Sequence, residues 1–146
     1  MPLPALLLLT DEVAYRAHFE QMYCRAPIPT FDAVAVRFRK GDFDHCCFES
    51  DRVTQQKAYF SSQRAQRLDW IKASLQDANA ELFVGWDKRA NAYDHDRRVC
   101  VVSGNYVVVI AITGPTTARF ITAYLADSGR TMMLIRRSPQ WPRAKK

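Results

Sequence analysis

The chain has 146 residues, of which 48% are hydrophobic and 25% are charged, and its formal net charge is +6. This length predicts one domain with a single core, and the hydrophobic content excludes an intrinsically disordered or low-complexity protein. The positive charge favours a polyanionic partner, with nucleic acid ahead of an anionic membrane, although a basic surface that serves only solubility would have the same charge.

The N-terminal stretch MPLPALLLLT is apolar but matches neither a membrane span nor a secretion signal. A span needs about 20 apolar residues, and a signal peptide has basic residues ahead of its apolar run. We therefore interpret the stretch as part of the core, and we expect a cytoplasmic protein with no membrane partner. The four cysteines agree with a reducing compartment, because no two of them have CxxC spacing.

The first half of the chain predicts two helices and one strand. Thr10 can cap a helix over 11–24. VAVRF at 34–38 alternates and is β-branched, which predicts a strand. A second helix over 61–79 begins at a capping serine, and QQKAYF at 55–60 is a candidate extension of it.

The second half of the chain changes to a strand period and predicts an antiparallel meander, because its connections are short. YVVVIAI is apolar on both faces and should be the central strand. The four predicted strands are 81–86, 97–102, 106–112 and 120–125.

The order of elements predicts an α+β fold with one or two helices packed on a four-stranded antiparallel meander sheet. We expect a single domain over 1–146. Within it, 1–39 would form an N-terminal helix and strand extension, and 139–146 a mobile basic tail that follows a short helix.

Arg64 lies on the apolar face of the second predicted helix, with Arg67 at its edge. A cation in that position is costly unless something pairs with it. Arg64 either extends past the sheet edge or binds a carboxylate such as Asp42 or Asp44, or it points into a pocket that holds phosphate. The apolar residues of this face are Phe60, Leu68, Ile71 and Leu75.

The last predicted strand, FITAYL, has one aliphatic face and one polar aromatic face. Strict alternation places Ile121, Ala123 and Leu125 together, and Phe120, Thr122 and Tyr124 opposite them. We expect the aliphatic face to pack on the helix. The other face is either an ordinary half-exposed surface or one that binds phosphate through Thr122 and stacks a base on Tyr124.

His45 lies in FDHCCFES, a run with the composition of a strand. Asp42 and Asp44 would favour its protonated form. Consecutive donors at 45–47 point to alternating faces, which is a poor arrangement for zinc, so His45 is either a proton carrier or an ordinary structural side chain. No P-loop, GxGxxG, HExxH or GxSxG motif is present, and we predict neither a metal nor a cofactor.

The order of FDHCCF, the helix FSSQRAQRLDWIKASL, the strands NYVVVIAIT and RFITAYLAD, and the intervening VGWDKRANAYDHDRRVCVV resembles phage-encoded members of the barnase–EndoU–colicin–RelE (BECR) group of nucleases. The resemblance covers roughly residues 40–140. It implies a metal-independent endoribonuclease that uses the ribose 2′-OH to form a 2′,3′-cyclic phosphate. It also implies tRNA or mRNA as substrate, a toxin or mobile-element role, and an inhibitor protein as partner.

The resemblance further implies roles for individual residues. His45 would carry the proton and Arg64 would stabilise the transition state, with Thr122 on the phosphate and Tyr124 stacking a base or donating a proton. Arg67 and Lys57 would contribute substrate-binding charge.

Two other functions fit the same sequence. One is a nucleic-acid-binding module without catalysis, and the other is a structural or assembly protein of a phage-like particle. The first predicts salt-sensitive binding, and the second predicts an exposed apolar patch. The nuclease reading predicts that His45, Arg64 and Thr122 converge in one pocket.

Overall fold

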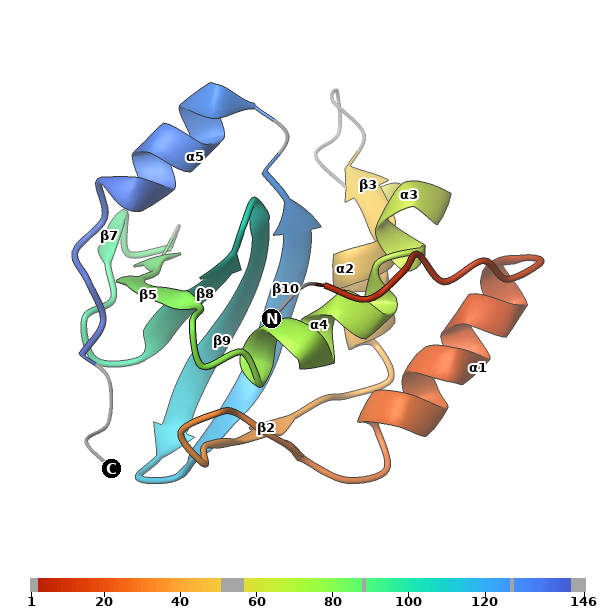
Figure 1. Cartoon of the computed structure of the whole chain (residues 1–146), viewed down its shortest axis with the longest axis horizontal. Helices are drawn as coiled ribbons and strands as arrows, with labels where there is room; N and C mark the ends of the chain where they lie inside the picture. The colour runs from red at the N-terminus through yellow and green to blue at the C-terminus, as the bar shows by residue number, and fades with distance from the viewer. Residues whose placement is uncertain (1–2, 51–56, 88, 127, 143–146) are drawn as a thin grey trace.

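The apolar strands of the second half of the chain form the centre of a mixed sheet in the computed structural model, which describes residues 3–50, 57–87, 89–126 and 128–142. The spatial order of the strands is β1-β2-β10-β9-β8-β5 (Figure 1). The strands are β1 (Ile28–Pro29), β2 (Ala35–Arg37), β5 (Glu81–Val84), β8 (Arg98–Ser103), β9 (Tyr106–Gly114) and β10 (Thr117–Leu125).

Five helices and two small hairpins complete the described part of the chain. The helices are α1 (Glu12–Tyr23), α2 (Asp42–Cys47), α3 (Ser62–Ala65), α4 (Leu68–Leu75) and α5 (Gly129–Arg136). The hairpins are formed by β3 (Phe48–Ser50) with β4 (Lys57–Phe60), and by β6 (Trp86–Asp87) with β7 (Ala92–Tyr93). None of the helices in the described ranges is long and apolar enough to cross a lipid bilayer.

The α+β class is confirmed, but the predicted numbers of strands and helices are wrong. The four predicted strands do pair as an antiparallel meander, with β9 in the centre. The sheet is larger because β2 pairs in parallel with β10, and β1 then pairs with β2. β2 and β10 are about 80 residues apart in the chain, so no local sequence pattern indicates that they pair.

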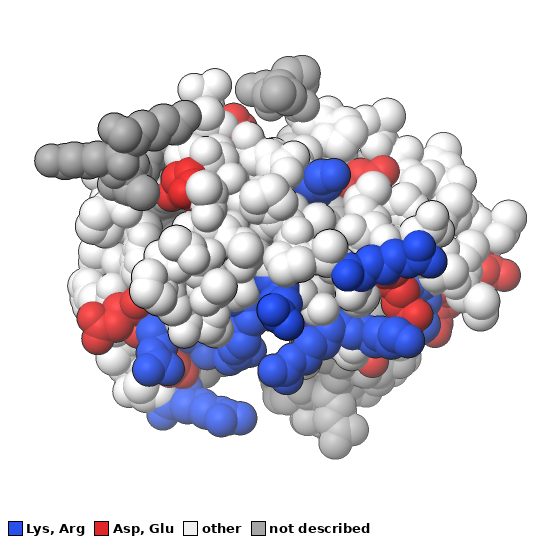
Figure 2. Space-filling view, turned by 90° about the horizontal axis from the view of Figure 1, so that it is seen from below, with Lys and Arg blue, Asp and Glu red and all other residues white. Residues whose placement is uncertain are grey.

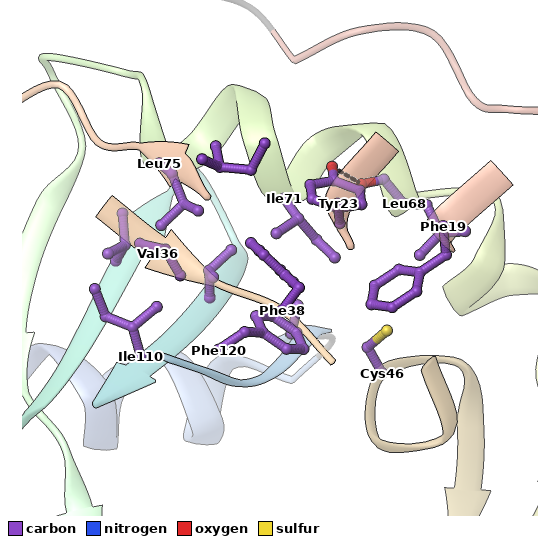
Figure 3. Packing of buried hydrophobic residues seen from close by; sticks show 14 of the residues in the cluster. Phe19, Tyr23, Val36, Phe38, Cys46, Leu68, Ile71, Leu75, Ile110 and Phe120 are labelled. Atoms are coloured by element: carbon purple, nitrogen blue, oxygen red, sulfur yellow. Dashed lines mark hydrogen bonds between the residues drawn. The ribbon is translucent and has the colours of Figure 1, made fainter. Parts of the chain in front are cut away.

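The main core lies between the sheet and the layer formed by α1 and α4. Its largest fully buried side chains include Phe19 and Tyr23 of α1 and Phe120 of β10. Figure 3 shows these rings together with aliphatic side chains of α4 filling the space above the strands. A second, smaller cluster lies on the opposite face of the sheet, where Met132 and Ile135 of α5 pack.

The N-terminal third belongs to this core and is more than an extension of it. Phe38, which follows β2, stacks on Phe120 with ring centroids 4.8 Å apart. The C-terminal segment is also bound to the sheet, since the Val84 amide donates to the Pro139 carbonyl and the Trp141 amide to the Leu82 carbonyl. The predicted free tail therefore does not begin at 139, and residues 143–146 lie outside the described part.

Three local predictions, one of a helix cap and two of the secondary structure of short runs, were wrong. Asp11, and not Thr10, caps α1, because its Oδ1 accepts from the Ala14 amide at 2.9 Å. The strand-like run FDHCC is the helix α2. The predicted extension of the second helix is the strand β4 over 57–60, with 55–56 outside the described residues.

The predicted helix over 61–79 is divided into α3 and α4 at Gln66 and Arg67. Tyr23 of α1 is anchored just beyond this break. Its hydroxyl donates to the Leu68 carbonyl and accepts from the Lys72 amide at 3.0 Å, and these two groups stand one helical turn apart in α4. Burial raises the pKa of this phenol well above its usual value, so the hydroxyl keeps its proton.

We expect Tyr23→Phe to lower the free energy of unfolding by on the order of 1–2 kcal/mol, because two buried backbone groups lose a shared partner. Urea denaturation followed by circular dichroism measures this. Tyr15→Phe is the matched control, since Tyr15 bridges backbone groups of the less buried N-terminal segment. Equal losses of unfolding free energy in the two variants would show that the hydrogen bonds of Tyr23 to α4 contribute no more than those of Tyr15.

Candidate nucleic-acid interface

A row of arginines crosses the face of the sheet opposite the main core. In the parallel pair, Arg37 of β2 stands beside Arg119 of β10. Their neighbours in each strand, Val36 and Ala118, are buried in the main core, so both arginines point to the other face. The row continues through Ala111 of β9, which is opposite both Arg119 and Arg98 of β8.

Placing Arg37 beside Arg119 is unfavourable in the free protein. Neighbouring strands are about 4.8 Å apart, and like charges at directly opposed positions destabilise a sheet. Within the described residues, no ion pair joins Arg37, Arg39 or Arg119 to a carboxylate. Guanidinium groups gathered without partners are suited to a bound phosphate, which takes two parallel hydrogen bonds from one arginine.

These arginines line a cleft of about 380 Å³, which we call the arginine cleft. This volume is within the range of sites that bind small ligands. Figure 2 views the molecule from below and shows Lys and Arg side chains gathered around a hollow in the surface. The polar lining residues are Arg37, Arg39, Asp42, His45, Thr113, Thr117 and Arg119.

His45 enters the arginine cleft from α2. The last carbonyls of a helix lack partners within the helix. The His45 carbonyl finds one in the Thr122 hydroxyl of β10, which donates to it at 3.0 Å. This bond holds the end of α2 against the sheet and leaves the exposed imidazole at the cleft.

Asp42 is the acidic residue of the cleft lining. Burial raises the pKa of its carboxyl above the ordinary value, and the nearby His45, Arg39 and Arg119 partly offset that rise. Its Oδ2 also accepts from the Arg39 amide at 2.8 Å, which fixes the turn that leads into α2. One carboxylate therefore faces three arginines, and the cleft keeps an excess of positive charge.

A second, smaller pocket lies at the other end of β10. It has a volume of about 60 Å³, which is room for a few water molecules. Burial raises the pKa of Tyr124 in this pocket to about 12, with Arg64 acting in the opposite direction, so the phenol is a hydrogen-bond donor at neutral pH. The lining residues are Glu49, Gln63, Arg64, Arg67, Tyr106, Ala123, Tyr124 and Leu125.

Arg67 packs within this small pocket. Its guanidinium carbon lies 5.0 Å from the centre of the Trp70 ring, and its Nη1 donates to the Gln63 carbonyl at 2.6 Å. Its Nε is buried and has no hydrogen-bond partner among the described residues. Arg64 forms no ion pair with Asp42 or Asp44, and Asp44 instead pairs with Arg16 at 2.9 Å.

The structure divides the predicted site residues between two places. His45 lines the arginine cleft, whereas Arg64, Arg67 and Tyr124 line the small pocket. Thr122 lines neither, and its hydroxyl holds the His45 carbonyl. The convergence of His45, Arg64 and Thr122 in one pocket is therefore not observed. The side chain of Lys57 lies outside the described part.

In the last strand the predicted faces hold for Ala123, Leu125 and Tyr124 but are wrong for Phe120 and Ile121, because β10 contains a bulge. Its register against β9 shifts between Phe120 and Thr122. Phe120 and Ala123 consequently share the main core, while Ile121 and Tyr124 pack in the smaller cluster under α5. A bulge breaks the two-residue alternation on which the prediction rested.

Sequence reasoning missed the three arginines of the cleft. A signal was present, because VAVRFRK alternates apolar residues with Arg37 and Arg39, and TARF places Arg119 between Ala118 and Phe120. The parallel pairing of β2 with β10 brings these separate positions onto one surface. No local sequence pattern indicates that pairing.

Comparison of the chain with protein-family models, with curated proteins and with solved structures found no match. Within the described residues, no cluster of three or more His, Cys, Asp or Glu side chains is arranged to hold a metal ion.

We expect Arg119→Gln to raise the free energy of unfolding by on the order of 0.5 kcal/mol at low salt, because it removes the like charge that stands beside Arg37 in the parallel pair. Added salt should shrink the gain through screening. Arg136→Gln is the control, since Arg136 has an ion-pair partner in Glu81 at 2.6 Å and its loss should be neutral or mildly destabilising. A clear loss of stability in Arg119→Gln would mean that this arginine supports the fold.

Proposed function

We propose that this protein binds RNA, with the arginine cleft as the site of the phosphate backbone. The observation that carries the proposal is that Arg37 and Arg119 stand side by side in adjacent parallel strands, with no ion pair to a carboxylate among the described residues. Arg39 lines the same cleft. Hydroxyls of Thr113 and Thr117 add hydrogen-bonding groups to the lining, and the two lie 2.9 Å apart. Arginines and hydroxyls are the usual partners of phosphate oxygens.

The overall charge supports the same conclusion. A net charge of +6 attracts a polyanion to the protein, and part of that charge is concentrated at the cleft. The sequence resemblance to the barnase–EndoU–colicin–RelE nucleases supports RNA ahead of DNA.

The salt dependence of binding tests the cleft. Contact with three phosphates of a single strand should give a slope of about −2 in a plot of log affinity against log salt concentration. We expect the double variant Arg37→Gln/Arg119→Gln to reduce the magnitude of that slope by about 1.4. Fluorescence anisotropy of a labelled RNA at several salt concentrations measures it.

The control for this experiment removes the same charge on the other side of the sheet. Arg25 follows α1 and Lys72 belongs to α4, and both helices are in the layer that covers the main core. Arg25→Gln/Lys72→Gln should weaken binding less and leave the slope nearly unchanged. Equal slopes in the two double variants would contradict binding at the arginine cleft.

A second candidate function is cleavage of the bound RNA, and the position of His45 at the cleft favours it. A base takes the proton of a ribose 2′-OH, and the 2′-oxygen then attacks the adjacent phosphorus. The bond from phosphorus to the 5′-oxygen breaks, and that oxygen receives a proton from an acid. The products are a 2′,3′-cyclic phosphate and a 5′-OH end.

In this reaction His45 would move a proton, and Arg37 and Arg119 would stabilise the charge that develops on the phosphorane. Thr122 would act as a positioning residue, because its bond to the His45 carbonyl fixes α2 on β10. Arg64 and Tyr124 would lie away from the reacting phosphate, at the other end of β10.

We expect the wild-type protein to cleave RNA in the presence of a chelator, and His45→Ala to lose on the order of 10²–10⁴-fold in rate. Mass spectrometry of the products should identify 2′,3′-cyclic phosphate ends. His18→Ala is the control, because His18 Nε2 lies 2.7 Å from Asp69, away from the cleft.

Arg64→Ala distinguishes the two pockets. Cleavage should persist in this variant if the arginine cleft is the active site, and should be lost if the small pocket is. RNA binding without cleavage by folded wild-type protein would reject the second candidate and leave the first in place.

A further inference from the structure

Three exposed rings follow one another along the β6–β7 hairpin and the residues after it. Trp86 and Tyr93 are 46% and 36% exposed, and their centroids lie 5.2 Å apart at an interplanar angle of 88°. His95 continues the series with its ring 6.2 Å from that of Tyr93 at 65°. In an edge-to-face pair each ring keeps at least one face that its partner does not cover, and a further ring can stack there.

The hairpin borders the arginine row. Arg98 ends the row on β8, and its Nη2 lies 4.0 Å from the Asp87 carboxylate of β6. Gly85 permits this approach, because a Cβ at that position would meet the Cβ of Arg98 at 2.7 Å. The Ser138 hydroxyl, two residues after α5, donates to the Tyr93 hydroxyl at 3.4 Å, so the hairpin lies next to the C-terminal end of α5.

We propose that these rings stack the bases of a single-stranded RNA whose phosphates follow the arginine row, so that the protein selects single strands over duplexes. This inference rests on the proposed function and specifies its substrate class. Arg37 and Arg98 are three strands apart, which is roughly 14 Å at the usual strand spacing, so the row spans several nucleotides. The aromatic hairpin lies at the Arg98 end.

The arginine row and the exposed rings together indicate single-stranded RNA as the partner. Proteins that bind single strands combine a basic track for the backbone with aromatic side chains on which bases stack. A duplex offers the same phosphates, but its bases are already stacked on one another and cannot reach Trp86. The arginine row alone would therefore bind both forms, whereas the rings add affinity for only one.

The experiment compares Trp86→Ala with Trp86→Phe on a labelled single-stranded oligoadenylate and on an RNA duplex of equal length. We expect Trp86→Ala to bind the single strand about tenfold more weakly and the duplex unchanged, because one stacked base is lost. Trp86→Phe should keep most of the affinity, since it retains a ring. The loss should be similar at low and high salt, because stacking releases no counterions.

Leu134→Ala is the matched control, since Leu134 is an exposed apolar residue of α5, 52% exposed, that offers no ring. An equal loss on single strand and duplex in Trp86→Ala, or no loss on either, would overturn the inference while leaving RNA binding at the cleft intact. Failure of wild-type protein to bind any RNA would instead overturn the proposed function. Circular dichroism of each variant confirms that the comparison is made between folded proteins.

Discussion

The parallel pairing of β2 with β10 is the constraint on which the rest of the structure depends. It brings Val36 and Phe38 into the main core, where Phe38 stacks on Phe120. The same register forces Arg37 to stand beside Arg119 on the opposite face. One strand therefore contributes both the apolar contacts that favour this arrangement and the charge repulsion that opposes it. The candidate interface exists because the apolar contacts prevail.

The position of His45 depends on a second contact to β10. The bulge between Phe120 and Thr122 turns the strand so that Phe120 stays in the core while the Thr122 hydroxyl reaches the end of α2. Since α2 is only six residues long, most of its backbone groups lie in its first or last turn, where partners outside the helix matter most. The bond from Thr122 thus anchors a short helix whose side chains at 42 and 45 complete the cleft.

Features that depend on residues close together in the chain could be predicted from the sequence, whereas features that depend on tertiary contacts could not. The meander was predictable, because tight turns join β8 to β9 and β9 to β10 and because YVVVIAI is apolar on both faces. The strand-like run at 43–47 became a helix because Phe43, Cys46 and Cys47 reach the core from a single turn, a tertiary effect that overrides local composition.

The candidate site was predictable only in part for the same reason. His45 and Thr122 were singled out and do lie together, but through a backbone carbonyl and not around a ligand. Arg64 was expected beside them, yet it belongs to α3 and lines the small pocket at the other end of β10. The arginines of the cleft come from segments about 80 residues apart, and no window of sequence contains both.

The anchoring of Tyr23 in α4 has a consequence for the dynamics of the fold. A helix of eight residues is too short to persist alone in water, so α4 depends on its contacts with the rest of the protein. Because one phenol from α1 bridges two backbone groups of α4, separation of α1 would expose the amide of Lys72 as well. The two helices should therefore open as one cooperative unit, with hydrogen exchange at Lys72 reporting the detachment of α1.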